Sequence, residues 1–167
     1  STTKALGLAI DRSGDVVVTG RFGGNTTIGN DSLIPTSANT IFLSKFSGAN
    51  GNAIWSKAFG GPGFNTGTGV TTDPNTGNIV MGGGFTGTAN FGGAPVPGGP
   101  GEAAFMAGYS SAGGVLWVNT FGGTFAGEQS QINAVRVDAK SNLVFTAYVG
   151  GPWTVNGEPL PTASCIA

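Results

Sequence analysis

The chain has 167 residues, of which 32 are glycine and only 9% are charged. The formal net charge is −1 and the basic residues are scattered, so no basic run exists that would hold a nucleic-acid backbone. No apolar stretch approaches the roughly 18 residues of a membrane-spanning helix. Because the hydrophobic share is a normal 39%, glycine among Val, Ile, Phe and Thr predicts short strands with tight turns rather than disorder.

The first 61 residues predict four strands in succession. A strand of small residues at 6–10 is followed by a turn beginning at Asp11 and by an apolar strand at 16–22. A long Gly/Asn/Thr-rich loop leads to a third strand at 41–46, whose hairpin turn contains Asn-Gly, a strong turn signal. The fourth strand, at 53–59, ends in Phe-Gly-Gly. The second strand is apolar at successive positions, which is typical of a sheet covered on both faces.

The same order of elements follows in a second unit and begins again in a third. The strands expected there are 67–71, 79–85, 104–109 and 115–121, then 132–137 and 143–149. A Gly/Pro-rich loop at 92–101 separates the middle two strands of the second unit. Landmark aromatic residues recur 63 or 62 positions apart: Phe22 and Phe85, Phe42 and Phe105, Trp55 and Trp117, Phe59 and Phe121. The repeat units are therefore 5–61, 66–123 and 132–167, the last incomplete.

Four strands per unit, repeated at this period, predict an all-β fold made of β-propeller blades, each a four-stranded antiparallel sheet. A right-handed β-helix has shorter and less varied rungs, and a two-sheet sandwich would not explain the repetition. Residues 1–167 would form part of one propeller. Since about two and a half blades cannot close a ring, we expect further blades as partners, either in a longer polypeptide or in other copies of the chain.

These patterns also carry a family resemblance. Asp11–Phe22, Ile41–Phe46 and Ile54–Gly61 resemble the SBBP repeat, the seven-bladed β-propeller repeat of bacteria. The later copies depart from that pattern at Met81, Gly108, Ala147 and Val149. The resemblance implies a blade of a larger extracellular or envelope-associated bacterial propeller, and it implies no catalytic residues because the repeat pattern is structural.

The recurring aromatic residues predict the core between blades, because side chains repeated in every unit bring the large area that such a core requires. Trp153 is different, since its counterparts are Thr26 and Ala89 and it falls in a loop. An unrepeated Trp on a loop is the best candidate for contact with a ligand, and packing against a neighbouring segment stays an open alternative.

The turns that begin at Asp11, Asp73 and Asp138 are reminiscent of calcium loops. A calcium loop needs several oxygen ligands at alternate positions and a later Glu, which these turns do not supply. We therefore expect no metal site, and we expect each carboxylate to cap backbone N–H groups of its own turn.

Catalytic chemistry is poorly supported by the sequence. There is no histidine, so Cys165 has no histidine to activate it, and we expect that cysteine to be a buried apolar residue. The unrepeated Glu102, Glu128 and Glu158 are the only plausible acids for glycoside hydrolysis, and nothing in the sequence brings two of them together. We expect no enzyme activity within this segment and no cofactor.

The function expected from the sequence is therefore a structural or adhesive scaffold that presents variable loops on a repeated frame. Low Lys and abundant Thr, Gly, Asn and Ser are typical of secreted or cell-surface proteins, which is the location we expect. The principal alternative is a lectin-like propeller that binds carbohydrate through an exposed aromatic ring and loop amides. A glycoside hydrolase is the least favoured of the three.

Overall fold

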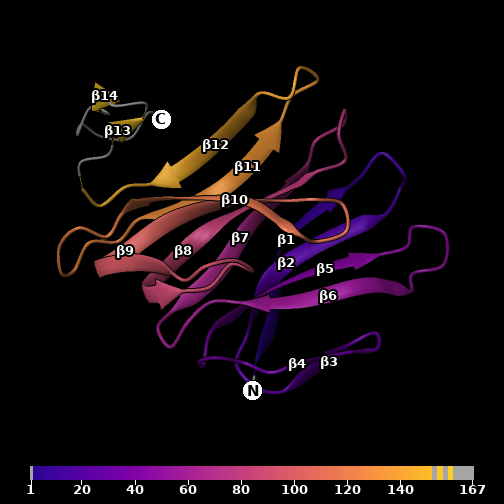
Figure 1. The fold of residues 1–167 in the computed structure, drawn as a ribbon, viewed down its shortest axis with the longest axis horizontal. Coiled ribbons are helices and arrows are strands. Elements are labelled where there is room, and N and C mark those ends of the chain that lie inside the picture. Colours follow the sequence, from indigo (N-terminus) through magenta and orange to yellow (C-terminus); the bar gives the residue numbers. More distant parts are fainter. Residues whose placement is uncertain (1, 152–153, 156–157, 160–167) are drawn as a thin grey trace.

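The computed structural model describes residues 2–151, 154–155 and 158–159 (Figure 1). The described part of the chain is all-β, with several antiparallel sheets, none of them closed. It contains no helix, and accordingly none that is long and apolar enough to cross a membrane.

The first sheet is a four-stranded antiparallel meander in chain order. Its strands are β1 (Thr3–Ile10), β2 (Val16–Phe22), β5 (Thr40–Phe46) and β6 (Ala53–Phe59). The segment between β2 and β5, expected to be a loop, instead contains a hairpin of β3 (Thr26–Ile28) and β4 (Asp31–Leu33). The hairpin forms because a two-residue turn with Gly29 at φ 60° joins its strands. Its buried Leu33 packs with Phe22 and Phe42 on the first sheet.

The second sheet repeats the meander with longer central strands. Its strands are β7 (Asn65–Thr72), β8 (Ile79–Ala89), β9 (Val96–Tyr109) and β10 (Val115–Gly122). The prediction of a loop at 92–101 is thus wrong from Val96 onward, where β9 pairs with the end of β8. Pro97 is tolerated opposite Thr88 because it lies at the start of the strand, where a missing N–H donor costs little.

The third unit contributes the paired strands β11 (Gln131–Val137) and β12 (Leu143–Tyr148). Two very short strands, β13 (Thr154–Val155) and β14 (Glu158–Pro159), pair with each other further along the chain. The expected second strand of this unit, 143–149, therefore ends one residue earlier than predicted.

The same irregularity occurs in the first strand of all three units. Each of these strands carries one extra residue opposite its partner strand, between Ala5 and Gly7, between Gly67 and Gly69, and between Ile132 and Ala134. Such a β-bulge increases the local right-handed twist. The three units therefore share a detail of backbone geometry as well as an order of strands.

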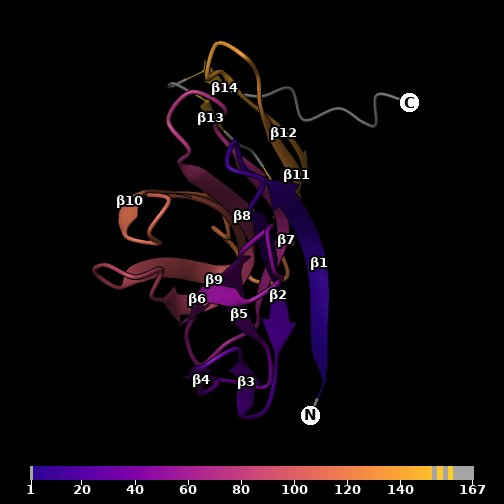
Figure 2. The ribbon, with the colours of Figure 1, turned by 90° about the vertical axis from the view of Figure 1, so that its right-hand side faces the viewer.

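The first strands of the three units lie side by side. Figure 2 shows β1, β7 and β11 gathered on one side of the molecule and the outer strands β6 and β10 on the other. Glycine permits the close approach of these inner strands, since a Cβ added to Gly69 would lie 3.1 Å from the Cα of Ala134. The sheets thus meet at their inner strands and face one another.

The main core lies between the first and second sheets. Val17, Ile41 and Leu43 of the first sheet pack there with Val70 and Met81 of the second. A second core, which includes Met106 and Ile132, lies between the second sheet and the β11–β12 pair.

The repeated aromatic residues do not all share one environment. The phenylalanines at 22, 42, 59, 85 and 105 are buried, whereas Phe121 and Trp55 are partly buried and Trp117 is 37% exposed. Trp55 lies against Gly113, in the β9–β10 turn of the next sheet. Trp117 instead covers Gly108 of its own sheet, because glycine stands there in place of Lys45. Trp117 thus differs from Trp55 in its contacts, and its expected place in a core between sheets stays a prediction.

Candidate functional site

One end of the sheets is formed by the three turns that follow the inner strands, here called the Asp turns (11–15, 73–78 and 138–142). In each turn the Asp carboxylate accepts a hydrogen bond from the backbone N–H two residues later, at 2.8 Å for Asp11 and Asp138 and at 2.9 Å for Asp73. Each turn also needs a residue with positive φ, supplied by Gly14, Gly77 and Ser141. The carboxylates therefore stabilise the backbone of their own turns.

Hydrogen bonds to the exposed Asp turns favour the ionised carboxylates. The backbone N–H of Asn75 is the main cause of the lowered pKa of Asp73, and the side chain of Asn142 is the main cause for Asp138. Within the described residues, no group of three or more His, Cys, Asp or Glu could hold a metal ion.

Neighbouring Asp turns are joined to one another. Arg12 Nη1 donates to the carbonyl of Asn75 at 3.1 Å, and Asn75 Nδ2 donates to the carbonyl of Ala139 at 3.0 Å. The hydroxyl of Ser141 donates to Asp73 Oδ1 at 3.0 Å. These contacts run from the first unit to the third and link the three turns in a row.

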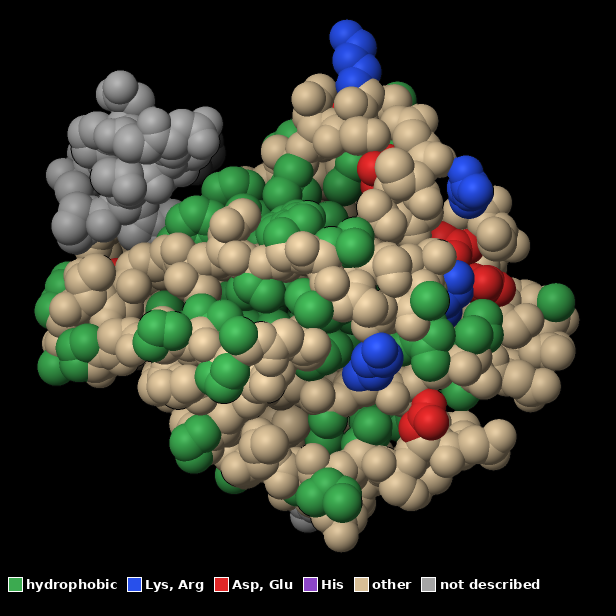
Figure 3. All heavy atoms as spheres, viewed as in Figure 1, with side chains coloured by type: hydrophobic (Ala, Val, Ile, Leu, Met, Phe, Trp, Pro, Cys, Tyr) green, Lys and Arg blue, Asp and Glu red, His purple; other side chains and the backbone are tan. Residues whose placement is uncertain are grey.

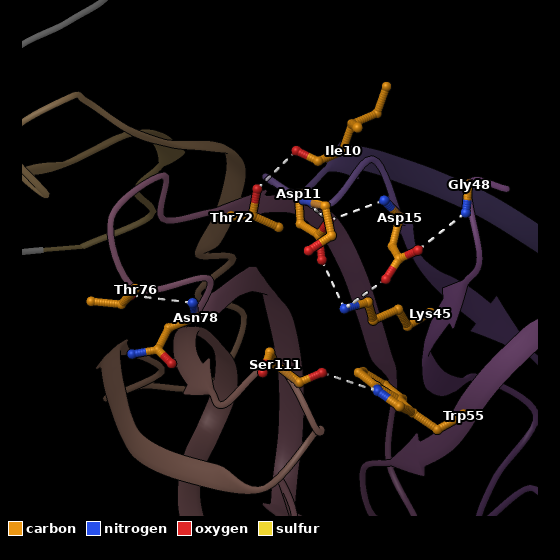
Figure 4. A network of polar contacts seen from close by, with 11 residues as sticks. Ile10, Asp11, Asp15, Lys45, Gly48, Trp55, Thr72, Thr76, Asn78 and Ser111 are labelled. Atoms are coloured by element: carbon orange, nitrogen blue, oxygen red, sulfur yellow. Dashed lines mark hydrogen bonds and ion pairs between the residues drawn. The ribbon is translucent and has the colours of Figure 1, made fainter.

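The first unit adds a buried ionic cluster to this end. Lys45 Nζ lies 2.7 Å from Asp11 Oδ2 and 3.2 Å from Asp15 Oδ2, and Asp15 Oδ1 accepts a hydrogen bond from the N–H of Gly48 (Figure 4). Burial opposes ionisation of Asp11, but the hydrogen bonds from Lys45 and from its own turn outweigh burial and lower its pKa. Burial likewise opposes the charge of Lys45, and the two carboxylates outweigh it and raise the pKa.

This cluster is not repeated in the second sheet. Asn78, directly before β8, stands in the place of Asp15, and Gly108 stands in the place of Lys45. Figure 3 shows most charged side chains of its viewed face in the right half of the view, and several of them lie at the top and upper right, where Figure 1 places the turns of this end. The single ammonium group of Lys45 is shared by both carboxylates, so the arrangement fastens a turn rather than exposing a reactive group.

The opposite end of the sheets holds the connectors from one unit to the next. In the first connector, the buried side chain of Asn65 donates to the carbonyls of Gly61 and Gly63 at 3.0 and 2.7 Å and accepts from the N–H of Gly61 at 3.1 Å. One amide side chain thus satisfies both donors and acceptors of a tight Gly-Gly turn.

Glu128 has the corresponding role in the second connector. Its buried carboxylate accepts hydrogen bonds from the N–H of Thr124 at 2.6 Å, the hydroxyl of Thr124 at 3.1 Å and the hydroxyl of Ser130 at 3.0 Å. Burial would raise its pKa, but hydrogen bonds from the backbone of Gly123 and Thr124 and from the two hydroxyl groups outweigh burial and lower it. The carboxylate proposed from sequence as an acid therefore organises a turn and is held ionised.

A groove of about 500 Å³ lies between the two connectors. It is lined by Phe64, Glu102, Gln129, Ser130, Gln131 and Tyr148. Phe64 and Gln129 precede the buried connector residues Asn65 and Ser130, whereas Gln131 and Tyr148 are paired across β11 and β12. The groove thus combines aromatic rings, amides and one carboxylate from two units.

Gly84 makes room for the side chain of Glu102. A Cβ added to Gly84 would lie 2.3 Å from Glu102 Oε1 and 3.4 Å from Gln131 Cγ, so any larger residue would displace the carboxylate. Burial raises the pKa of Glu102, and no hydrogen-bond partner of its carboxylate occurs among the described residues. Of the two glutamates whose side chains the structure describes, Glu102 is a candidate to meet a ligand and Glu128 is not.

The other residues singled out from sequence divide by position. Trp153 and Cys165 lie outside the described residues, as does the side chain of Glu158. Glu102 and Glu128 are joined through the backbone, where the N–H of Glu102 donates to the carbonyl of Glu128 at 2.7 Å. Sequence reasoning missed Phe64 and Tyr148, although comparison of Tyr148 with its equivalents would have revealed an unrepeated aromatic residue.

No protein-family model matches the chain, and none of the curated proteins compared with it is similar. The function is therefore inferred from the repeat and from the geometry of its two ends.

Proposed function

We propose that this chain is a non-catalytic interaction scaffold built from β-propeller blades. The Asp turns hold neighbouring blades together at one end, and the connector end meets a partner. The proposed setting is the outside of a bacterial cell, either secreted or on the surface, in keeping with the composition and with the resemblance to the SBBP repeat.

The contrast between the two ends carries this proposal. At the Asp-turn end, each of the three units has an Asp carboxylate that accepts a backbone hydrogen bond and one residue with a positive φ. At the connector end, the equivalent positions on the second strands hold Arg21, Gly84 and Tyr148, each paired with a different residue of the inner strand. The turns that link the units are thus alike, whereas the side chains at the connector end differ from unit to unit. A scaffold that binds a specific partner requires such a combination.

The packing of the sheets supports propeller blades as the frame. Val70, on the face of the second sheet that is covered by the first, is 1% exposed. The equivalent residue of the first sheet, Leu8, is 60% exposed, and its neighbour Ile10 is 63% exposed. The open face of the first sheet therefore has the apolar character of a face that another blade would cover, either from the same polypeptide or from a second copy.

The state of the carboxylates supports binding rather than catalysis. Asp11 is paired with Lys45, and Glu128 is surrounded by donors of its own connector. Glu102 stands alone in the groove without a second carboxylate among the lining residues. Hydrolysis of a glycosidic bond by the usual route needs two carboxyl groups facing the same bond.

A pair of double variants tests the role of the connector end. Arg21→Ala with Tyr148→Ala alters that end, and Arg12→Ala with Lys140→Ala alters the Asp-turn end as the matched control. Each protein is tested by circular dichroism for folding and on immobilised panels of glycans, peptides and matrix proteins for binding. We expect binding to be lost only in the first variant. The proposed role would be refuted if only the second variant lost binding, or if both variants still bound. Turnover of a polysaccharide that depends on Glu102 would also refute it.

A second experiment tests the blade interface. Light scattering over a range of protein concentrations should detect self-association of the chain, and Leu8→Lys with Ile10→Lys should weaken it without altering the circular dichroism spectrum. A chain that stays monomeric, and whose free energy of unfolding is unaffected by these two lysines, would contradict an interface at this face. Labelling of intact cells with an antibody to the chain tests the proposed location.

A further inference from the structure

The groove at the connector end exists because one unit departs from the repeat. Arg21 and Tyr148 occupy equivalent positions in the first and third units, and Gly84 occupies that position in the second. The space left by the missing side chain receives the carboxylate of Glu102 and the stem of Gln131. Its volume of about 500 Å³ falls within the roughly 300–1,000 Å³ of small-molecule sites.

The polar groups of the groove are matched to hydroxyl groups. The side-chain amides of Gln129 and Gln131 each offer both donors and an acceptor, and the carboxylate of Glu102 offers acceptors alone. A sugar hydroxyl donates and accepts at once, so it can bridge an amide and a carboxylate. The carboxylate is partly withdrawn from water without a protein partner among the described residues, which favours occupation by a ligand donor.

The rings at the two sides of the groove supply apolar faces. Phe64 is partly buried in the connector, and Tyr148 is 56% exposed on β12. Flat, rigid rings of this kind bury the apolar C–H face of a ligand at a low cost in side-chain entropy. Rings together with amides therefore suit a molecule with one apolar face and a rim of hydroxyls.

The charge around the groove favours a neutral ligand. Glu102 would repel an anionic polymer, whereas the guanidinium of Arg21 lies 5.5 Å from the centre of the Phe64 ring and disfavours a cation on that ring. Lys4 lies opposite Arg21 in the ladder of β1 and β2 and adds a second positive charge beside it. Charges of both signs therefore flank the groove.

From these observations we propose that the groove between Phe64 and Tyr148 binds a neutral carbohydrate, with Tyr148 as the stacking platform and Glu102 and Gln131 as partners of its hydroxyls. The proposal rests on the proposed function, since it names the class of partner that the connector end meets.

The test is a glycan array followed by calorimetry with the neutral oligosaccharide that gives the strongest signal. Tyr148→Ala should weaken binding by about tenfold or more through loss of stacking. Glu102→Gln should weaken it by a similar factor, about tenfold, because a charge-assisted hydrogen bond becomes a neutral one. Val144→Ala is the matched control, since Val144 lies on the same strand, is 59% exposed and is remote from the groove lining.

The salt dependence separates a neutral sugar from a charged ligand. Binding of a neutral sugar should keep the same affinity from low to high salt, whereas an ammonium ligand on Glu102 would be weakened by salt. Absence of signal on the array, or equal loss of affinity in Tyr148→Ala and Val144→Ala, would overturn the carbohydrate proposal. If the array is silent while Arg21→Ala with Tyr148→Ala abolishes binding of a peptide or matrix protein, the carbohydrate assignment fails and the scaffold function stands.

Discussion

Gly83 on β8 lies opposite Phe105 on β9, and the ring of Phe105 covers the position that a side chain of residue 83 would occupy. A Cβ at this position would lie 2.9 Å from Phe105 Cε1 and 1.9 Å from the carbonyl oxygen of Thr66. Gly20 and Phe42 repeat the pairing in the first sheet with the same two distances, there to Phe42 Cε1 and to the carbonyl oxygen of Lys4. A large ring against a glycine is thus a fixed element of the unit.

Gly83→Ala should lower the free energy of unfolding by roughly 3 kcal/mol, because the added methyl group collides with backbone atoms that cannot move aside. Gly93→Ala is the control, since the nearest atom to an added Cβ is Val115 Cγ1 at 3.5 Å. That variant should stay within about 0.5 kcal/mol of the parent. Urea denaturation measures both values, and equal stabilities would show that the backbone of β8 adapts to the methyl group.

Lys45→Ala should lower the free energy of unfolding by about 3 kcal/mol at neutral pH, because Asp11 and Asp15 then face each other without a cation. Lys140→Ala, in an exposed Asp turn, should change it by less than about 0.5 kcal/mol. Since the pKa of Asp11 is lowered in the fold, its contribution is present above the ordinary carboxyl pKa of 3.8 and is lost as the pH falls through the lowered value. Denaturation at several pH values should therefore show the difference between parent and Lys45→Ala shrinking in acid.

Trp55 and Trp117 occupy equivalent positions but should differ in their importance for stability. Trp55 Nε1 donates to the carbonyl of Ser111 at 3.2 Å, and nearby Lys57 Nζ donates to the carbonyl of Gly113 at 2.7 Å, so this part of β6 holds the next sheet. Trp55→Ala should cost about 2 kcal/mol and Trp117→Ala about 1 kcal/mol, since the latter removes a ring that only covers its own sheet. Thermal and urea unfolding of the two variants compare them directly, and a larger loss in Trp117→Ala would contradict the assigned contacts.

Glu102→Gln should stabilise the fold at neutral pH. Burial raises the pKa of Glu102, so the folded protein holds this proton up to a higher pH than the unfolded chain does. The stability of the parent must then fall as the pH rises from the ordinary carboxyl pKa through the raised one, while the glutamine variant lacks this dependence. Unfolding measured at pH values on both sides of that window should show the free energy of unfolding of the variant rising relative to the parent as the pH rises. A relative gain found only in acid would exclude a raised pKa of Glu102.

Strand positions in this protein are largely predictable from the sequence, because the repeat marks them. β2 and β6 have the predicted bounds, and the antiparallel order follows from short turns with Asn-Gly or glycine. The β3–β4 hairpin and the start of β9 were missed, since their segments are rich in the residues that also form loops. Their pairing depends on contacts with the sheets beneath them, such as Leu33 with Phe42, which composition does not reveal.

The groove was harder to predict than the strands. It depends on the absence of a side chain at Gly84 and on the register that sets Gln131 opposite Tyr148. Comparison of the second strands aligns Arg21, Gly84 and Tyr148, but only the structure shows that Glu102 and Gln131 lie against Gly84. The glutamates were recognised as unrepeated, but the distinction between Glu128, enclosed by donors, and Glu102, without one among the described residues, required their hydrogen bonds.

The extra residue in each inner strand limits where residues can be inserted into a unit or deleted from it. At Thr68 the alternation of β7 between its two faces is shifted by one residue relative to β8. Deleting that residue would turn Asn65 to the opposite face and leave the Gly-Gly connector without its amide. Insertions and deletions are therefore confined to the turns, and the Asp turns do vary in length, at 11–15, 73–78 and 138–142, while the strands on both sides keep their pairing.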